Sequence, residues 1–289
     1  MSIDNAANSF SLISEVKELD FMRIAALLIC QSVLLTAPAA FAHEFWIAPE
    51  KYQVEVGENI QADFVNGQEF RGGTLAWFDK RVDRAEAMIS DMIFPIEGRL
   101  GDIPAITQTA PEDGLMVLIT EAAPSTVNYR EPEKFADFVN HKDLPVDPEA
   151  MEYPFKEAYS RHAKALVGIG SGAGQDQAMG MATEFVVLEN PYTDNVSDGL
   201  DVQLLYQGAP RVDAQIEVFQ MDPEGQVTIT LLSSDQHGKA TIPVLAGHRY
   251  LVDSVVLRAP SQDTLDRVAA PKTVKWETLW AALTFAVPQ

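Results

Sequence analysis

Short alternating segments, separated by turn residues, fill most of the chain after residue 43 and restrict the folds open to it. The clearest segments lie in the last third of the chain, at 200–206, 214–219 and 250–257. The tight turn 222–225, Asp-Pro-Glu-Gly, separates 214–219 from a further predicted strand at 227–231. Apolar residues at every second position are typical of half-buried strands. The regular recurrence of such segments between turns favours antiparallel β-sandwiches.

The strand pattern predicts a mainly β fold made of two antiparallel β-sandwich domains. We expect an N-terminal β-rich domain over 43–182 and a C-terminal sandwich over 183–289, the latter of the transthyretin-like or carboxypeptidase-regulatory-like kind. The apolar run 115–120 indicates a strand that is buried on both faces. Two domains of this size fit a chain of 289 residues.

The middle of the chain breaks this pattern and predicts a short helical or irregular insertion near 131–165. Apolar residues recur at helical spacing within 132–141, which indicates a short amphipathic helix. The segment 155–167 fits a helix or a strand. The stretch 168–180 is rich in glycine and alanine and predicts a mobile loop.

The first 42 residues have the features of a secretory signal peptide. Arg23 precedes the apolar run 24–35, and Ala40-Phe41-Ala42 offers a small-x-small cleavage site. The apolar run is shorter than the roughly 20 residues that span a bilayer. We therefore expect cleavage after Ala42 and a periplasmic protein without stable membrane insertion, although an uncleaved anchor is the alternative. The polar segment before Met22 suggests that translation starts at Met22, or that the n-region is overlong.

Charge and cysteine content exclude several functions. Lys and Arg total 21 against 42 Asp and Glu, a net charge of −21, whereas binding to nucleic acid requires clustered basic residues. The only cysteine, Cys30, lies in the segment expected to be removed. The exported chain would then have neither disulfides nor thiolate metal ligands.

Cleavage after Ala42 would make His43 the first residue of the exported chain. Its α-amine and ring Nδ1 can then chelate one metal ion, because an α-amine with a pKa of about 7.7–8.0 loses its proton to a metal near neutrality. Glu44 would add an oxygen ligand or a compensating charge. A further imidazole would give a nitrogen-rich site suited to copper or nickel. The alternative is a frayed terminus without a ligand.

The second ligand is not fixed by any local motif, since the chain has no HxxxH or HExxH spacing. His162 lies among Tyr159, Arg161 and Lys164, which makes it the most site-like candidate, and His248 lies at a turn before a strand. His141 ends the predicted helix. No nucleophile elbow or phosphate-binding loop is present, and we assign no catalytic residue and no organic cofactor.

Several segments resemble a bacterial periplasmic family of unknown function that carries a nickel-uptake (NikM-like) label. The resemblance covers essentially the whole exported chain. The segments that carry it are Ala42-His-Glu-Phe-Trp-Ile47, 124–129, 157–167, 189–192, 204–208, 214–219 and 276–285. It implies a periplasmic β-rich protein that takes part in nickel or cobalt uptake, with an inner-membrane metal permease as its possible partner.

Three functions agree with these features. The first, which we favour, is a periplasmic binder of nickel, cobalt or copper that assists metal uptake and is not an enzyme. The second is a copper-dependent oxidative enzyme that uses the same N-terminal chelate. The third is a structural or adhesive envelope module without a ligand. Oxidase activity after copper loading separates the first two, and metal stoichiometry separates both from the third.

Overall fold

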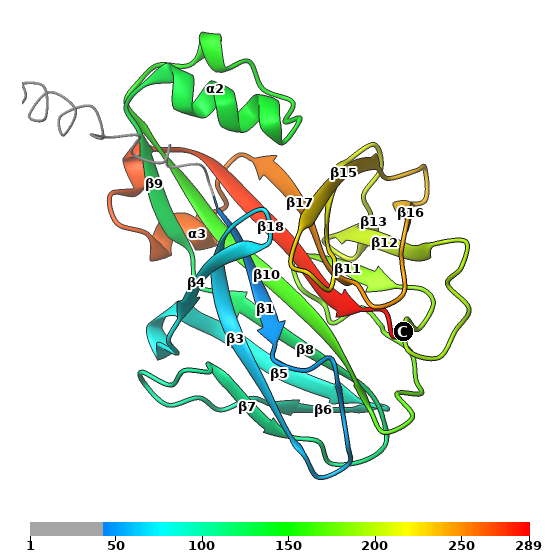
Figure 1. Ribbon diagram of the computed structural model, residues 1–289. Coiled ribbons are helices and arrows are strands. Elements are labelled where there is room, and N and C mark those ends of the chain that lie inside the picture. The colour runs from blue at the N-terminus through cyan, green and yellow to red at the C-terminus, as the bar shows by residue number, and fades with distance from the viewer. Residues whose placement is uncertain (1–42) are drawn as a thin grey trace, which may run out of the picture. The chain divides into compact units, whose positions relative to one another are not determined.

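A computed structural model describes residues 43–289 as a mainly β protein (Figure 1). The predicted signal peptide and cleavage site lie outside the described residues. Two α-helices, α2 (Pro132–His141) and α3 (Gln262–Arg267), and three short 3-10 helices, Asp79–Arg81, Pro148–Ala150 and Pro271–Thr273, interrupt the strands of the described chain. None of the helices in this part of the chain is long and apolar enough to cross a membrane.

A ten-stranded central sheet organises the fold. Its strands follow the order β15 (Val227–Ser233), β14 (Gln215–Met221), β17 (Arg249–Arg258), β18 (Val274–Ala286), β10 (Phe155–Ile169), β8 (Gly114–Ala122), β5 (Val82–Ile89) and β6 (Met92–Pro95). Two further strands, β2 (Gln53–Val54) and β9 (Ser125–Tyr129), also pair with β10. Neighbouring strands are antiparallel, except that β10 runs parallel to β18 and to β2.

Two smaller antiparallel sheets complete the described chain. In the N-terminal sheet, β3 (Asn59–Gln68) pairs with β1 (Glu44–Pro49), β4 (Arg71–Leu75) and β7 (Ile106–Thr109). In the C-terminal sheet, β12 (Leu200–Tyr206) pairs with β11 (Thr183–Val187), β13 (Ala209–Pro210) and β16 (Lys239–Ile242). Sheets that pack face to face and are mostly antiparallel confirm the predicted β-sandwich class.

The two small sheets cover opposite faces of the central sheet. On β10, Ala163 and Ala165 pack in one core with the N-terminal sheet, whereas Leu166 packs in a second core with the C-terminal sheet. On β17, Leu251 and Val252 divide between the same two cores. Because successive side chains of a strand point to opposite faces, this alternation makes three layers. It also explains why the predicted strand at 115–120, now β8, is buried on both faces.

The predicted helix at 132–141 is confirmed as α2, which covers one end of the central sheet (Figure 1). Its buried residues Phe135, Phe138 and Val139 form a third core with Trp280 of β18. The rings of Phe138 and Trp280 stack with centroids 5.8 Å apart. Since Trp280 and Ala282 share a face of β18, α2 and the N-terminal sheet lie on the same side of the central sheet.

The helical insertion predicted near 131–165 is shorter than expected. From Phe155 onward the chain is the long strand β10, which lies in the centre of the fold. The strand is one of the two alternatives that the sequence left open for 155–167, and its charged residues Glu157 and Lys164 are buried and paired. The division into domains at 43–182 and 183–289 stays a prediction; both segments contribute strands to the central sheet.

Candidate functional site

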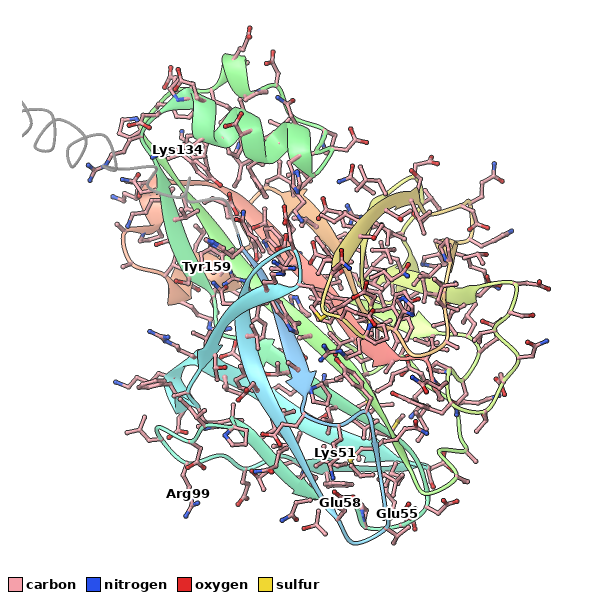
Figure 2. The ribbon with its side chains drawn as sticks, in the orientation of Figure 1. Lys51, Glu55, Glu58, Arg99, Lys134 and Tyr159 are labelled. Atoms are coloured by element: carbon pink, nitrogen blue, oxygen red, sulfur yellow. The ribbon has the colours of Figure 1, made fainter. Side chains whose placement is uncertain are left out.

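The start of β1 is held firmly against the central sheet. β1 lies across β10 and β18 (Figure 1). The half-buried residue His43 precedes β1, and its carbonyl oxygen accepts a hydrogen bond from Arg161 Nη2 at 3.0 Å. The Arg161 guanidinium lies 4.5 Å from the centroid of the Tyr159 ring. Figure 2 shows Tyr159 on β10, below Lys134 of α2 in that view. The backbone of residue 43 is therefore held at its carbonyl oxygen.

Glu44 enters a buried ionic cluster with Lys142, Glu217 and Asp253, which we call the Lys142 cluster. Lys142 Nζ donates to Glu44 Oε1 at 3.1 Å, to Glu217 Oε2 at 2.5 Å and to Asp253 Oδ2 at 3.0 Å. None of the four side chains is more than 5% exposed. The cluster joins β1, the end of α2, β14 and β17, where Glu217 and Asp253 are directly opposite each other.

Charge and burial together set the protonation of the Lys142 cluster. Burial opposes the charged form of Lys142, but the carboxylates of Asp253, Glu44 and Glu217 outweigh it and raise the lysine pKa well above its usual value. Burial, reinforced by the charges of Glu44 and Glu217 and opposed by Lys142, raises the pKa of Asp253 to about 7. Because three carboxyl groups surround one ammonium group, the cluster favours a protonated carboxyl group near neutrality. The Lys142 ammonium also lies 4.9 Å from the Trp280 ring centroid, within cation–π range.

His141 lies at the rim of the Lys142 cluster. It is the last residue of α2, its side chain is 60% exposed, and its Nε2 lies 3.0 Å from Glu217 Oε1. The hydrogen bond with Glu217 raises the pKa of His141 against the opposing effect of burial. Burial acts to raise the pKa of Glu217, but hydrogen bonds from His141 and Lys142 hold it below its usual value.

The other two candidate ligands lie elsewhere. His162 is buried on β10, with Nδ1 3.1 Å from Trp280 O and Nε2 3.9 Å from Glu121 Oε2. Because it follows Arg161, it faces the side of the sheet opposite His43. His248 precedes β17, and its Nδ1 lies 3.0 Å from its neighbour Ala246 O. Asp253 of the Lys142 cluster lies five positions further along the chain, roughly 16 Å along β17.

The structure links Glu44 to His141 through Lys142 and Glu217, and it brings neither His162 nor His248 to them. Within the described chain, Glu44, Glu217 and Asp253 form a group of buried ligand atoms that lie within 4.8 Å of one another. Glu44 Oε2 and Asp253 Oδ1 have no hydrogen-bond partner among the described residues. Carboxylates in this arrangement can hold a cation, and the Lys142 ammonium fills that role here.

Sequence reasoning missed Lys142, Glu217 and Asp253. Their contacts join residues between 75 and 111 positions apart, so no local spacing reveals them. One signal was present: Asp253 is a lone acid within the apolar strand segment 250–257. An acidic residue at such a position must find a partner once it is buried.

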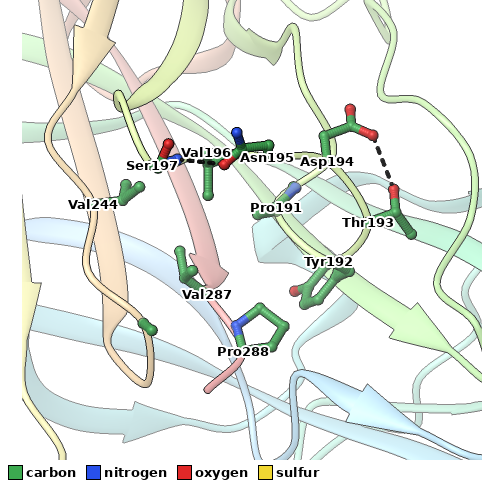
Figure 3. Close-up of a pocket in the computed structure, with 11 residues that line it drawn as sticks. Pro191, Tyr192, Thr193, Asp194, Asn195, Val196, Ser197, Val244, Val287 and Pro288 are labelled. Atoms are coloured by element: carbon green, nitrogen blue, oxygen red, sulfur yellow. Dashed lines mark hydrogen bonds between the residues drawn. The ribbon is translucent and has the colours of Figure 1, made fainter.

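A shallow hollow lies at the far end of the C-terminal sheet and has a volume of about 310 Å³. Figure 3 shows Tyr192, Val244, Val287 and Pro288 among its lining residues. Its one ionisable carboxylate, Asp194, accepts hydrogen bonds from Asn190 N and Thr193 Oγ1. The Lys142 cluster is therefore the richer candidate for chemistry.

These features define a mainly β protein of three packed layers, with a buried ionic cluster at the start of its first strand. The chain belongs to the family described as "Domain of unknown function (DUF4198)", whose family model matches residues 40–257. The comparison with curated proteins finds no match.

Three solved structures align with the chain at low similarity. A tetra-tandem repeat in the extending region of a large adhesion protein is 10% identical, with a TM-score of 0.21, and the alignment covers 84% of this chain and 49% of that one. The D0-D1 domain of Intimin is 12% identical, with a TM-score of 0.20 and coverage of 83% and 97%. The Clostridium thermocellum CbhA fibronectin(III)-like modules are 9% identical, with a TM-score of 0.19 and coverage of 84% and 94%. This chain spans about half the length of the adhesion-protein chain.

Proposed function

We propose that the exported chain begins at His43 and binds nickel, cobalt or copper through the α-amine and imidazole of that residue. It is a periplasmic metal-binding protein that serves as an accessory component of metal uptake, with an inner-membrane permease as its partner. The NikM-like resemblance supports uptake as the context, and the nitrogen donors support a transition metal as the ligand.

The anchoring of residue 43 is the observation that carries this proposal. Arg161 holds the His43 carbonyl oxygen, and the next side chain, Glu44, is fixed in the Lys142 cluster. A chain cleaved after Ala42 would therefore carry its amine and imidazole on a residue whose carbonyl is held. Holding a chelating group in place reduces the conformational entropy lost when the metal binds.

The donor set fits a transition metal better than a hard cation. An amine and an imidazole are nitrogen donors of the kind that copper and nickel prefer, whereas magnesium and calcium prefer oxygen. The Lys142 cluster next to residue 43 carries more carboxylates than ammonium groups. This negative charge favours a divalent cation at its rim.

Intact mass of the exported protein, followed by titration with Ni²⁺ and Cu²⁺, tests the proposal. We expect a mass that begins at His43 and one metal ion per chain. A variant with one alanine added before His43 should bind at least about tenfold more weakly, or about 1.4 kcal/mol, because the chelating amine is displaced. His237→Ala, which alters an exposed turn, is the control. A different first residue, or equal affinity with and without the added alanine, would contradict the proposal.

A further inference from the structure

We infer that the outer edge of β15 is a docking surface for a second copy of this chain, whose own β15 adds to it as an antiparallel strand. The two central sheets then join into one across a twofold axis at Thr230. The inference concerns assembly and does not depend on metal binding.

β15 is the last strand on its side of the central sheet, and it pairs only with β14 among the described residues. All seven of its residues are in register with β14, from Val227 opposite Met221 to Ser233 opposite Gln215. A regular strand at the edge of a sheet offers its outward N–H and C=O groups to another strand.

Hydrogen bonds at the two ends of the β14–β15 pair show which backbone groups face outward. Asp222 N donates to Gln226 O at 3.0 Å, and Ser234 N donates to Ala214 O at 3.0 Å. Because hydrogen-bonded pairs alternate along an antiparallel ladder, residues 228, 230 and 232 bond to β14. The N–H and C=O groups of the remaining residues of β15 therefore face away from the sheet, and these residues are 227, 229, 231 and 233.

The sequence of β15 lacks the features that usually protect an edge strand. Its residues, Val-Thr-Ile-Thr-Leu-Leu-Ser, include no charge, no proline and no glycine. Ile229 is 45% exposed and Leu231 is 59% exposed, and both lie on the same face of the strand. The edge strand on the other side of the sheet, β6, has only four residues and ends with Pro95. Since exposed edges are usually short, charged or interrupted by proline, we expect β15 to be covered in the assembled protein.

The strand is complementary to itself when two copies run antiparallel. A twofold axis at Thr230 places Ile229 opposite Leu231 of the second copy, and Val227 opposite Ser233. Every outward residue then meets another outward residue, so all of their N–H and C=O groups can pair. The apolar side chains of Ile229 and Leu231 from both copies also meet on one face. An axis at Ile229 or at Leu231 would leave one outward residue of each strand without a partner.

Charge at the ends of the strand also favours a second copy in this register. Two positions beyond the strand, the register brings Asp235 of one copy opposite Gly225 of the other. The Gly225 carbonyl oxygen accepts a hydrogen bond from Arg71 Nη2 at 3.1 Å, so a guanidinium lies next to the position that the acid reaches. The twofold axis provides this pairing at both ends. It opposes the repulsion between two acidic copies, since the full chain carries a net charge of −21.

Sedimentation equilibrium of the exported protein over about 1–100 μM measures the association. We expect a monomer–dimer equilibrium that strengthens with added salt, because salt screens the repulsion between the two copies. Leu231→Lys places a charge in the apolar patch and should raise the dissociation constant of the dimer at least about tenfold. Ile93→Lys, at a residue of β6 that is 51% exposed, is the matched control and should leave the constant unchanged. A protein that stays monomeric over this range would overturn the inference and leave the edge to an extended peptide of another protein.

Cysteine cross-linking tests the register, because the chain from His43 onward contains no cysteine. Facing residues of a non-hydrogen-bonded pair have Cα atoms about 4.5 Å apart, which a disulfide can bridge. Thr230→Cys should therefore form a disulfide between two copies with a copper–phenanthroline oxidant. Thr228→Cys, on the same face, lies opposite Leu232 and roughly 13 Å along the strand from its counterpart, so it should not. Equal cross-linking of the two variants, or cross-linking of neither, would overturn the inference, and unchanged thermal unfolding of Leu231→Lys would verify that this substitution acts on association.

Discussion

Replacing Glu157 by glutamine should make the stability of this protein less sensitive to pH. Glu157 is fully buried in β10, and its Oε1 accepts a hydrogen bond from Thr278 Oγ1 at 2.5 Å. Its Oε2 has no partner among the described residues. Burial raises the pKa of Glu157 to about 7, although the Thr278 hydrogen bond and the Arg161 charge oppose the rise.

The direction of the effect follows from this raised pKa. The folded chain holds the Glu157 proton more tightly than the unfolded chain, in which the carboxyl has an ordinary pKa near 4.5. The stabilising contribution of the proton is therefore complete below about pH 4.5 and is lost as the pH rises through about 7. The whole change amounts to about 3 kcal/mol, because one pKa unit corresponds to about 1.4 kcal/mol.

Urea unfolding at several pH values from 5 to 8 measures this contribution. Between those limits, the unfolding free energy of the unmodified protein should fall by roughly 2 to 3 kcal/mol more than that of Glu157→Gln. Asp253, whose pKa is also about 7, contributes to both proteins and cancels in the difference. Glu97→Gln, at an exposed position, should behave like the unmodified protein. Parallel pH profiles for Glu157→Gln and the unmodified protein would refute the reasoning.

Two further substitutions test the packing around the site. Lys142→Met leaves three buried carboxylates without their cation. It should lower the urea-unfolding free energy by about 3–5 kcal/mol at pH 8, and by less at pH 5. Lys134→Met, on the exposed face of α2, is the control. Gly67→Ala would place a Cβ 1.9 Å from Arg71 O in the β3–β4 hairpin, so its thermal midpoint should drop by several degrees, whereas Gly73→Ala, with open space around it, should be nearly neutral. Equal losses within either pair would contradict the corresponding argument.

The local pattern of the sequence predicts individual strands well and their pairing poorly. Alternation found the strand segments 200–206 and 250–257, which appear as β12 and within β17. The parallel pairing of β10 with β18 aligns Glu157 with Trp276 and so joins residues more than a hundred positions apart. The alternation of apolar and polar residues indicates which face of the sheet a side chain occupies. It carries no information about which strand lies next to it.

β10 shows that the burial of a charged residue can leave no local signal in the sequence. Lys164 is fully buried, yet its Nζ donates to both Asp176 oxygens at 3.0 and 3.2 Å and to Gln177 O at 3.0 Å. Glu184 Oε1 accepts from Gly180 N at 2.8 Å and thereby fixes part of the glycine-rich segment expected to be mobile. These partners come from a loop and a strand that the sequence places well after Lys164, so burial of the lysine was not visible in its local context.

The candidate site was only half predictable for a related reason. The N-terminal position of His43 follows from a local processing pattern, whereas the Lys142 cluster depends on four separate segments. The end of α2 nevertheless has one property that a sequence can reveal. Consecutive residues of a helix point about 100° apart, so the adjacent pair His141 and Lys142 can send one side chain to the surface and the other inward. That divergence gives one helix end both a buried cation for the carboxylates and an exposed imidazole, each in contact with Glu217.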